Sequence, residues 1–208
     1  MPAIRFRFCA IAVACCVAAC SDNNNVIPTN VVADTIDAGH ARGDVIAVHA
    51  SNELAGDDYL IVIGKTASIL SAFNDGELAQ SDFAAQVVSS EGVDQFANHL
   101  VVSYDDANAA LAPVLRVYGV SFLPSSTASD VTAQYNTGLA DLRATPPEDI
   151  DLAYIELQVL NLAAAQIMLQ ELSLQVGPGA MNDYIVTSQN LVDDQLDDAT
   201  MLMNSFFF

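Results

Sequence analysis

Residues 149–172 read DIDLAYIELQVLNLAAAQIMLQEL, and their apolar side chains recur at alternating steps of three and four residues. The positions of this repeat are Leu152, Ile155, Val159, Leu162, Gln166, Leu169, Ser173 and Val176. Side chains with this spacing form a stripe along one face of an α-helix, and a stripe of this length must be buried against other helices. The segment therefore predicts a long helix in a helical core.

Three further segments carry the same repeat, which we call a seam. The first seam consists of Ile63, Ala67, Leu70, Asn74, Glu77, Ser81, Ala84 and Val88. The second consists of Val93, Ala97, Leu100, Tyr104, Ala107, Leu111, Val114 and Tyr118. The last consists of Met181, Ile185, Ser188, Val192, Gln195, Ala199 and Leu202. Four long segments of this kind predict an all-α fold, a four-helix bundle.

The connections between these segments indicate the topology of the bundle. Residues 89–92 (SSEG) separate the first two helices, residues 119–126 (GVSFLPSS) end the second, and residues 177–179 (GPG) end the third. A shorter helical stretch lies between residues 129 and 144, and we expect it to pack across the bundle as part of the central connection. Two helical pairs joined by one longer link give the topology of a ferritin-like bundle.

The N-terminus has the features of a secretory signal peptide. Arg5 and Arg7 precede an uncharged apolar run that ends in VAAC at residues 17–20. This ending resembles a bacterial lipobox, which predicts cleavage before Cys20 and acylation of that residue. The alternative is an ordinary signal peptide cut at a site such as the one after Ala14. Acyl chains on Cys20 would hold the protein on its membrane, and Ser21 favours the outer membrane by resemblance to enterobacterial sorting.

The cysteines are consistent with a core that is held without disulfides. All four, Cys9, Cys15, Cys16 and Cys20, lie in or at the end of the predicted signal peptide. Irregular sequence then continues to about residue 57. We predict three parts: a lipoprotein signal peptide at residues 1–19, a lipidated and largely irregular tether at 20–57, and a helical bundle at 58–205.

The charge of the chain limits its partners. There are 26 acidic residues against 6 lysines and arginines, which gives a formal net charge of −20. Such a balance repels phosphate backbones and anionic lipid headgroups. We therefore expect no nucleic-acid partner, and membrane attachment through acyl chains rather than through electrostatic docking.

Two stretches resemble the ferritin-like family of predicted outer-membrane proteins known as domain of unknown function 4142. Residues 74–108 (NDGELAQSDFAAQVVSSEGVDQFANHLVVSYDDAN) resemble its first helical pair, and residues 149–172 resemble its helix with Asp-x-x-Tyr and Gln-Val. Residues 191–202 (LVDDQLDDATML) resemble its last helix. The resemblance covers roughly residues 58–203 and implies a ferritin-like bundle in the cell envelope.

The chain departs from that family where the family carries histidine. Tyr104, Leu162 and Gln195 stand at those places, whereas Glu77 is retained. Leucine cannot bind a metal, and neutral tyrosine or glutamine is a poor ligand beside imidazole. We therefore predict no metal and no cofactor at Glu77.

Two interpretations of Glu77 remain open. It belongs either to a polar core, hydrogen-bonded or protonated, or to a small-ligand or proton-binding pocket with Tyr104 and Gln195. Four aspartates, Asp193, Asp194, Asp197 and Asp198, indicate a solvated helix face, with a calcium site as the alternative.

No nucleophile with a base partner and no pair of catalytic carboxylates is apparent, so we predict no catalytic residues. The leading hypothesis is a non-enzymatic, lipid-anchored envelope protein that has a binding or structural role and has lost its metal site. A possible partner is another envelope protein. The alternative is a metal-binding, ferritin-like stress protein or oxidoreductase.

Overall fold

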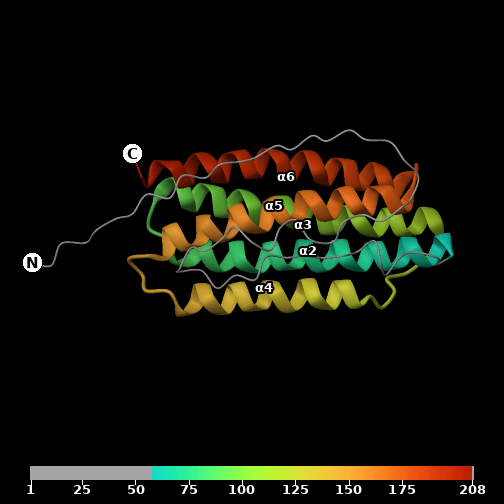
Figure 1. Cartoon of the computed structure of the whole chain (residues 1–208), viewed down its shortest axis with the longest axis horizontal. Helices are drawn as coiled ribbons and strands as arrows, with labels where there is room; N and C mark the ends of the chain where they lie inside the picture. The colour runs from blue at the N-terminus through green and yellow to red at the C-terminus, as the bar shows by residue number, and fades with distance from the viewer. Residues whose placement is uncertain (1–57, 208) are drawn as a thin grey trace, which may run out of the picture. The chain divides into compact units, whose positions relative to one another are not determined.

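The computed structural model describes residues 58–207, and these form five packed α-helices without a strand (Figure 1). The helices are α2 (Tyr59–Val87), α3 (Glu91–Tyr118), α4 (Ser126–Ala144), α5 (Ile150–Val176) and α6 (Ala180–Ser205). The predicted all-α class is therefore confirmed, and each of the four seams lies on one of the long helices. The predicted signal peptide, Cys20 and the tether lie outside the described residues.

Two glycine-containing turns end helices as the sequence predicts. Gly119 follows α3 with φ 67°, and its N–H group bonds to the carbonyls of Arg116 and Leu115. Gly177 follows α5 with φ 61°. Residues with a side chain rarely adopt this left-handed conformation, so glycine allows the chain to leave the helix axis at once.

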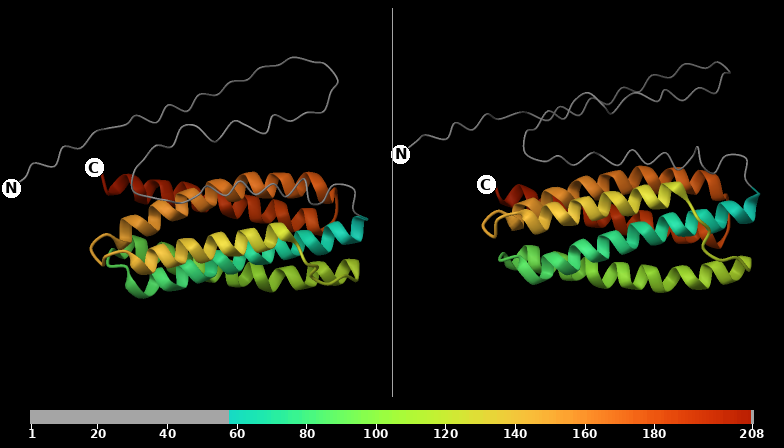
Figure 2. Two further views of the ribbon diagram at one scale, coloured as in Figure 1. Left: turned by 60° about the horizontal axis from the view of Figure 1, so that its bottom comes forward. Right: turned by 90° about the horizontal axis from the view of Figure 1, so that it is seen from below.

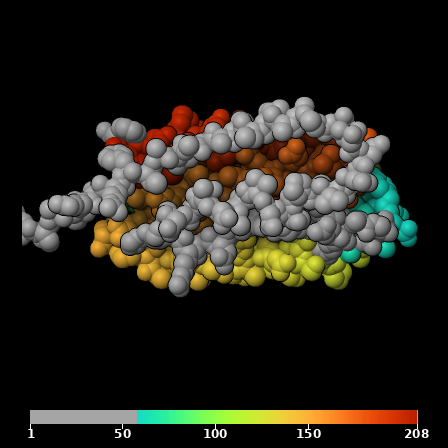
Figure 3. Space-filling model, in the orientation of Figure 1, coloured from blue at the N-terminus to red at the C-terminus, as the bar shows by residue number. Residues whose placement is uncertain are grey.

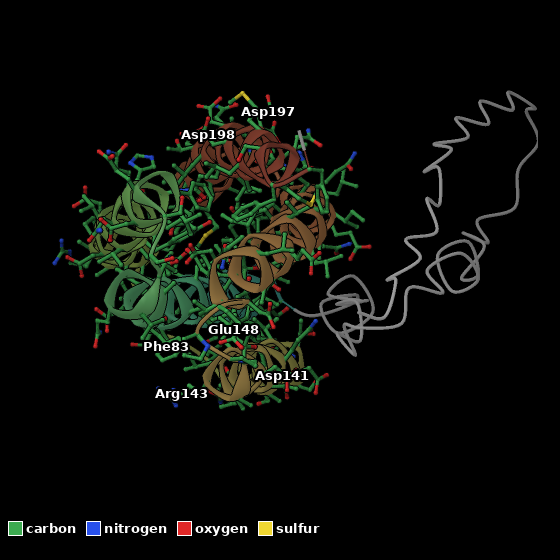
Figure 4. The ribbon with its side chains drawn as sticks, turned by 90° about the vertical axis from the view of Figure 1, so that its left-hand side faces the viewer. Phe83, Asp141, Arg143, Glu148, Asp197 and Asp198 are labelled. Atoms are coloured by element: carbon green, nitrogen blue, oxygen red, sulfur yellow. The ribbon has the colours of Figure 1, made fainter. Side chains whose placement is uncertain are left out.

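The four long helices surround the core, and α4 lies outside them against α2. α2 packs against α3, α4 and α5, while α6 packs against α5 and α3. The view along the bundle shows this arrangement, with α4 at the edge of the group (Figure 4). Figure 3 shows α4 and α6 along opposite edges of the bundle.

The short helix α4 runs lengthwise beside α2 rather than across the bundle, so this prediction was wrong (Figures 1 and 2). The reason is its own apolar face. The buried residues Val131, Tyr135, Leu139 and Leu142 extend along most of the helix. Burying all of them requires α4 to follow α2 along its length.

Two glycines allow α4 to approach its neighbours closely. A Cβ atom added at Gly76 of α2 would overlap the ring of Tyr135, so the tyrosine ring occupies the place of a side chain. A Cβ atom at Gly138 of α4 would lie 2.8 Å from Nε2 of Gln80. At one end of the pair, the guanidinium of Arg143 lies 5.7 Å from the centre of the Phe83 ring (Figure 4).

The turn between α2 and α3 is fixed to the start of α5 by a single carboxylate. Asp151 accepts hydrogen bonds from the Ser89 N–H group at 2.8 Å, the Ser89 hydroxyl at 2.9 Å and the Ser90 N–H group at 2.8 Å. One side chain thus satisfies the backbone donors of the two serines that directly precede α3. This contact holds the two helical pairs in register at one end.

The helix α5 is long and apolar enough to span a membrane by length and composition alone, and it is the one such helix among the described residues. In the most apolar 18-residue stretch of α5, 50% is buried inside the bundle. A core helix meets the same criterion, so this property is weak evidence for a span.

The close contact at Gly76 predicts a large effect of a small substitution. Gly76→Ala should lower the free energy of unfolding by about 1–3 kcal/mol, because the new methyl group displaces the Tyr135 ring from a packed core. Gly92→Ala is the matched control, since a Cβ atom there meets only the end of the Leu202 side chain at 3.2 Å. Urea denaturation of the full chain measures both. Equal stability of the two variants would contradict the packing described.

Candidate functional site

The interior of the bundle contains buried polar side chains contributed by several helices. Those of α2 are Thr66, Asn74, Glu77, Gln80 and Ser81; those of α5 are Gln158 and Asn161; those of α6 are Ser188 and Gln195. Three of the four buried tyrosines of the described chain, Tyr104, Tyr135 and Tyr154, donate through their hydroxyls to members of this set. We call the group the polar core.

Glu77 is the one fully buried acidic side chain among the described residues, with no exposed surface. The Tyr135 hydroxyl donates a hydrogen bond of 2.7 Å to its Oε1 atom. Its Oε2 atom is buried and has no hydrogen-bond partner. Burial raises the pKa of this carboxyl from its ordinary value of 4.5 to about 7, although the Tyr135 hydroxyl and the neighbouring Gln158 amide act in the opposite direction.

The structure brings Tyr104 and Gln195 together and leaves Glu77 bonded elsewhere. Tyr104 donates a hydrogen bond of 2.7 Å to Oε1 of Gln195, whereas Nε2 of Gln195 has no partner. Burial raises the pKa of the Tyr104 hydroxyl well above its usual range, and the negative charge of Glu77 raises it further. Tyr104 and Glu77 are thus near enough to interact electrostatically, without a direct hydrogen bond.

The hydrogen-bond partner of Glu77, Tyr135 of α4, was missed from the sequence. Phe73 packs edge-on between the two tyrosines, with its ring centre 5.4 Å from that of Tyr104 and 6.2 Å from that of Tyr135. The available signal was the position of Tyr135 on the apolar face of its helix, four residues after Val131 and four before Leu139. The expectation that α4 crosses the bundle concealed this contact.

Three amides form a second connected group in the polar core. Nδ2 of Asn161 donates to Oε1 of Gln80 at 2.8 Å, and Nε2 of Gln80 donates to the backbone carbonyl of Tyr135 at 3.0 Å. Nε2 of Gln158 donates to the same Oε1 of Gln80 at 3.4 Å. Oε1 of Gln158 is buried without a partner. These amides connect α2, α4 and α5.

Tyr154 of α5 contacts the polar core at Ser81 of α2. Its hydroxyl donates to Oγ of Ser81 at 2.9 Å. Burial raises the pKa of this hydroxyl, and the Glu77 charge acts in the same direction. All three tyrosine hydroxyls therefore stay protonated at physiological pH.

The donor set around Glu77 does not fit a metal ion. Leu162 is fully buried and supplies no donor atom, and His99 is exposed on α3. Within residues 58–207 no three or more histidine, cysteine, aspartate or glutamate side chains are grouped for metal binding. Asp193, Asp194, Asp197 and Asp198 are all exposed, and Figure 4 places the last two on the outer side of α6.

The fold and the polar core define residues 58–207 as a five-helix, all-α domain with an isolated carboxyl in its interior. No protein-family model matches the chain, and no curated protein or solved structure shows significant similarity to it. One carboxyl surrounded by neutral hydroxyls and amides can bind and release a proton.

The raised pKa of Glu77 predicts a pH-dependent stability. The folded chain binds this proton more tightly than the unfolded chain, so the contribution is fully present below about pH 4.5 and is lost as pH rises through about 7. Glu77→Gln removes the titration. Relative to the natural chain, the variant should gain about 2–3 kcal/mol in free energy of unfolding between pH 5 and pH 8.

Urea denaturation at the two pH values measures this gain. Glu148→Gln is the matched control, because it makes the same chemical change at an exposed carboxylate. Its effect on the free energy of unfolding should be small beside that of Glu77→Gln, because the Glu148 side chain is in contact with water. A flat profile for Glu77→Gln would mean that Glu77 titrates as an ordinary carboxyl.

Proposed function

We propose that this protein is a lipid-anchored helical-bundle protein of the bacterial cell envelope with a binding or structural role. The anchor would be Cys20, and the location the outer membrane facing the periplasm. The bundle would be ferritin-like in topology, with a metal site that has been lost. It would act without catalytic residues, and a partner would be another envelope protein.

The observation that carries this proposal is the filling of the bundle interior. Tyr104 donates a hydrogen bond of 2.7 Å to Oε1 of Gln195, and Leu162 is fully buried in the apolar core. A metal ion needs several anionic or imidazole donors that converge on one point. Here a single carboxyl meets neutral groups, which supports a structural role for the polar core.

The packing of the five helices also supports a role that does not depend on an open active site. The apolar core draws on all five helices, and α4 is fixed to α2 by the close contact at Gly76. Two side chains near the C-terminus, Met201 and Phe207, remain 63% and 62% exposed. Exposed apolar side chains of this kind are suited to contact with a partner.

The lipid anchor is tested by fractionation of cells that express the full chain. Cys20→Ala should move the protein from the membrane fraction to the soluble fraction, because the acyl chains supply the membrane affinity. Cys16→Ala is the control, since Cys16 lies inside the apolar run of the predicted signal. Retention of the Cys20→Ala variant on membranes would contradict acylation at this residue.

A metal-binding ferritin-like protein is the second candidate, and the unpartnered Oε2 of Glu77 favours it. The two candidates differ in metal content. We expect full-length protein purified without added chelator to contain far less than one equivalent of iron, manganese or copper. A stoichiometric metal that is lost in Glu77→Gln would favour the second candidate.

A further inference from the structure

A surface groove lies between the start of α3 and the end of α6. It has a volume of about 410 Å³, and both helices line it: α3 with Gln95, Phe96 and His99, and α6 with Asp198, Met201 and Leu202. Phe96 is buried and Leu202 is half-buried, whereas the Met201 side chain is 63% exposed. The groove therefore presents apolar surface to solvent between two polar walls.

Carboxylates continue both walls of this groove. Glu91 lies one helical turn before Gln95 on α3, and its Oε1 atom accepts a hydrogen bond of 3.2 Å from the Gln95 amide. Asp194 lies one turn before Asp198 on α6, so these two aspartates share a face of that helix. All three acidic side chains are exposed. A molecule bound in the groove therefore meets negative charge on both sides.

The two helices supply almost no positive charge to neutralise these carboxylates. The helix α6 contains no lysine or arginine in its 26 residues. The one such residue of α3 is Arg116, which lies in the last turn, at the opposite end of that helix from the groove. Charges of one sign beside an apolar surface raise the local concentration of oppositely charged molecules.

Charge distinguishes among the molecules that an apolar groove can bind. A second copy of this chain carries a net charge of −20 and would be repelled. The chain's own residues 20–57 include six acidic residues against one arginine, Arg42, so they are repelled as well. Nucleic acids and anionic lipid headgroups are polyanions or anions and are disfavoured for the same reason. A basic protein segment is the occupant that the charge favours.

We propose that the groove between α3 and α6 binds a basic segment of a partner protein. An apolar side chain of the partner packs on Phe96 and Leu202, and its lysine or arginine side chains lie against the carboxylates of the two walls. The proposal rests on the binding role proposed above and specifies the chemistry of the partner. An apolar centre with a polar rim is the usual arrangement of a protein interface, and the charged rim makes association sensitive to salt.

The probe for this groove is a fluorescent peptide with the repeating sequence Arg-Arg-Leu-Phe, and fluorescence anisotropy measures its binding to the full chain. One comparison peptide replaces arginine with glutamate, and another replaces leucine and phenylalanine with glycine and serine. We expect saturable binding of the first peptide alone, with an affinity that falls as salt rises. Absence of binding, or equal binding of the peptide without apolar side chains, would overturn the proposal.

A pair of double variants tests where the peptide binds. Asp194→Asn with Asp198→Asn should weaken binding about tenfold, because two carboxylates of the groove lose their charge. Asp130→Asn with Asp141→Asn is the matched control, since it removes the same charge from exposed positions of α4 at the opposite edge of the bundle. Salt screens charges at that distance, so the control should bind nearly as well as the natural chain. Equal losses in the two variants would overturn the proposal.

A second readout locates the peptide without changing the charge of the groove carboxylates. His99 lines the groove, and its ring signals in proton NMR are assigned by their absence in His99→Gln. These signals should shift in the natural chain as the peptide binds. Binding that leaves them unchanged would occur elsewhere on the surface and would overturn the proposal. Neither readout depends on acylation of Cys20, so a failure here is distinct from a failure of the lipid anchor.

Discussion

The cost of removing the Glu77 carboxyl from water is the constraint on which the polar core depends. An ionised carboxylate without compensation is expensive in an apolar interior, and proteins respond by pairing it or by shifting its pKa. The described part of this chain offers no cation there: one tyrosine hydroxyl reaches the carboxyl, and burial raises its pKa to about 7. Tyr135 therefore has two roles. Its ring packs against α2 at Gly76, and its hydroxyl donates a hydrogen bond to the Glu77 carboxyl.

This dependence explains why a glycine directly precedes Glu77. Gly76 precedes Glu77 in α2, and its missing side chain is the space in which the Tyr135 ring lies. A larger residue at 76 would move the ring away, and Oε1 of Glu77 would lose its donor. The missing side chain at Gly76, the packing of the Tyr135 ring and the hydrogen bond to Glu77 therefore all belong to one contact between α2 and α4.

The sequence predicts the helices much better than it predicts the contacts between them. Each seam follows a single helix, so the long helices and their apolar faces can be found from local spacing, and Glu77, Tyr104 and Gln195 are all buried. The partners of these residues depend on which helices are neighbours. Tyr135 lies 58 positions from Glu77 along the chain, and no local pattern links the two. The lengthwise packing of α4 was missed for the same reason.

The count of donors and acceptors in the polar core explains what it can bind. A metal ion would need several anionic ligands, and this interior supplies one carboxyl among tyrosines and amides that are already engaged. A proton needs only one basic oxygen, and Oε2 of Glu77 is buried without a hydrogen-bond partner. One buried carboxyl among neutral hydroxyls and amides can therefore exchange a proton, whereas it cannot by itself complete the coordination of a metal ion.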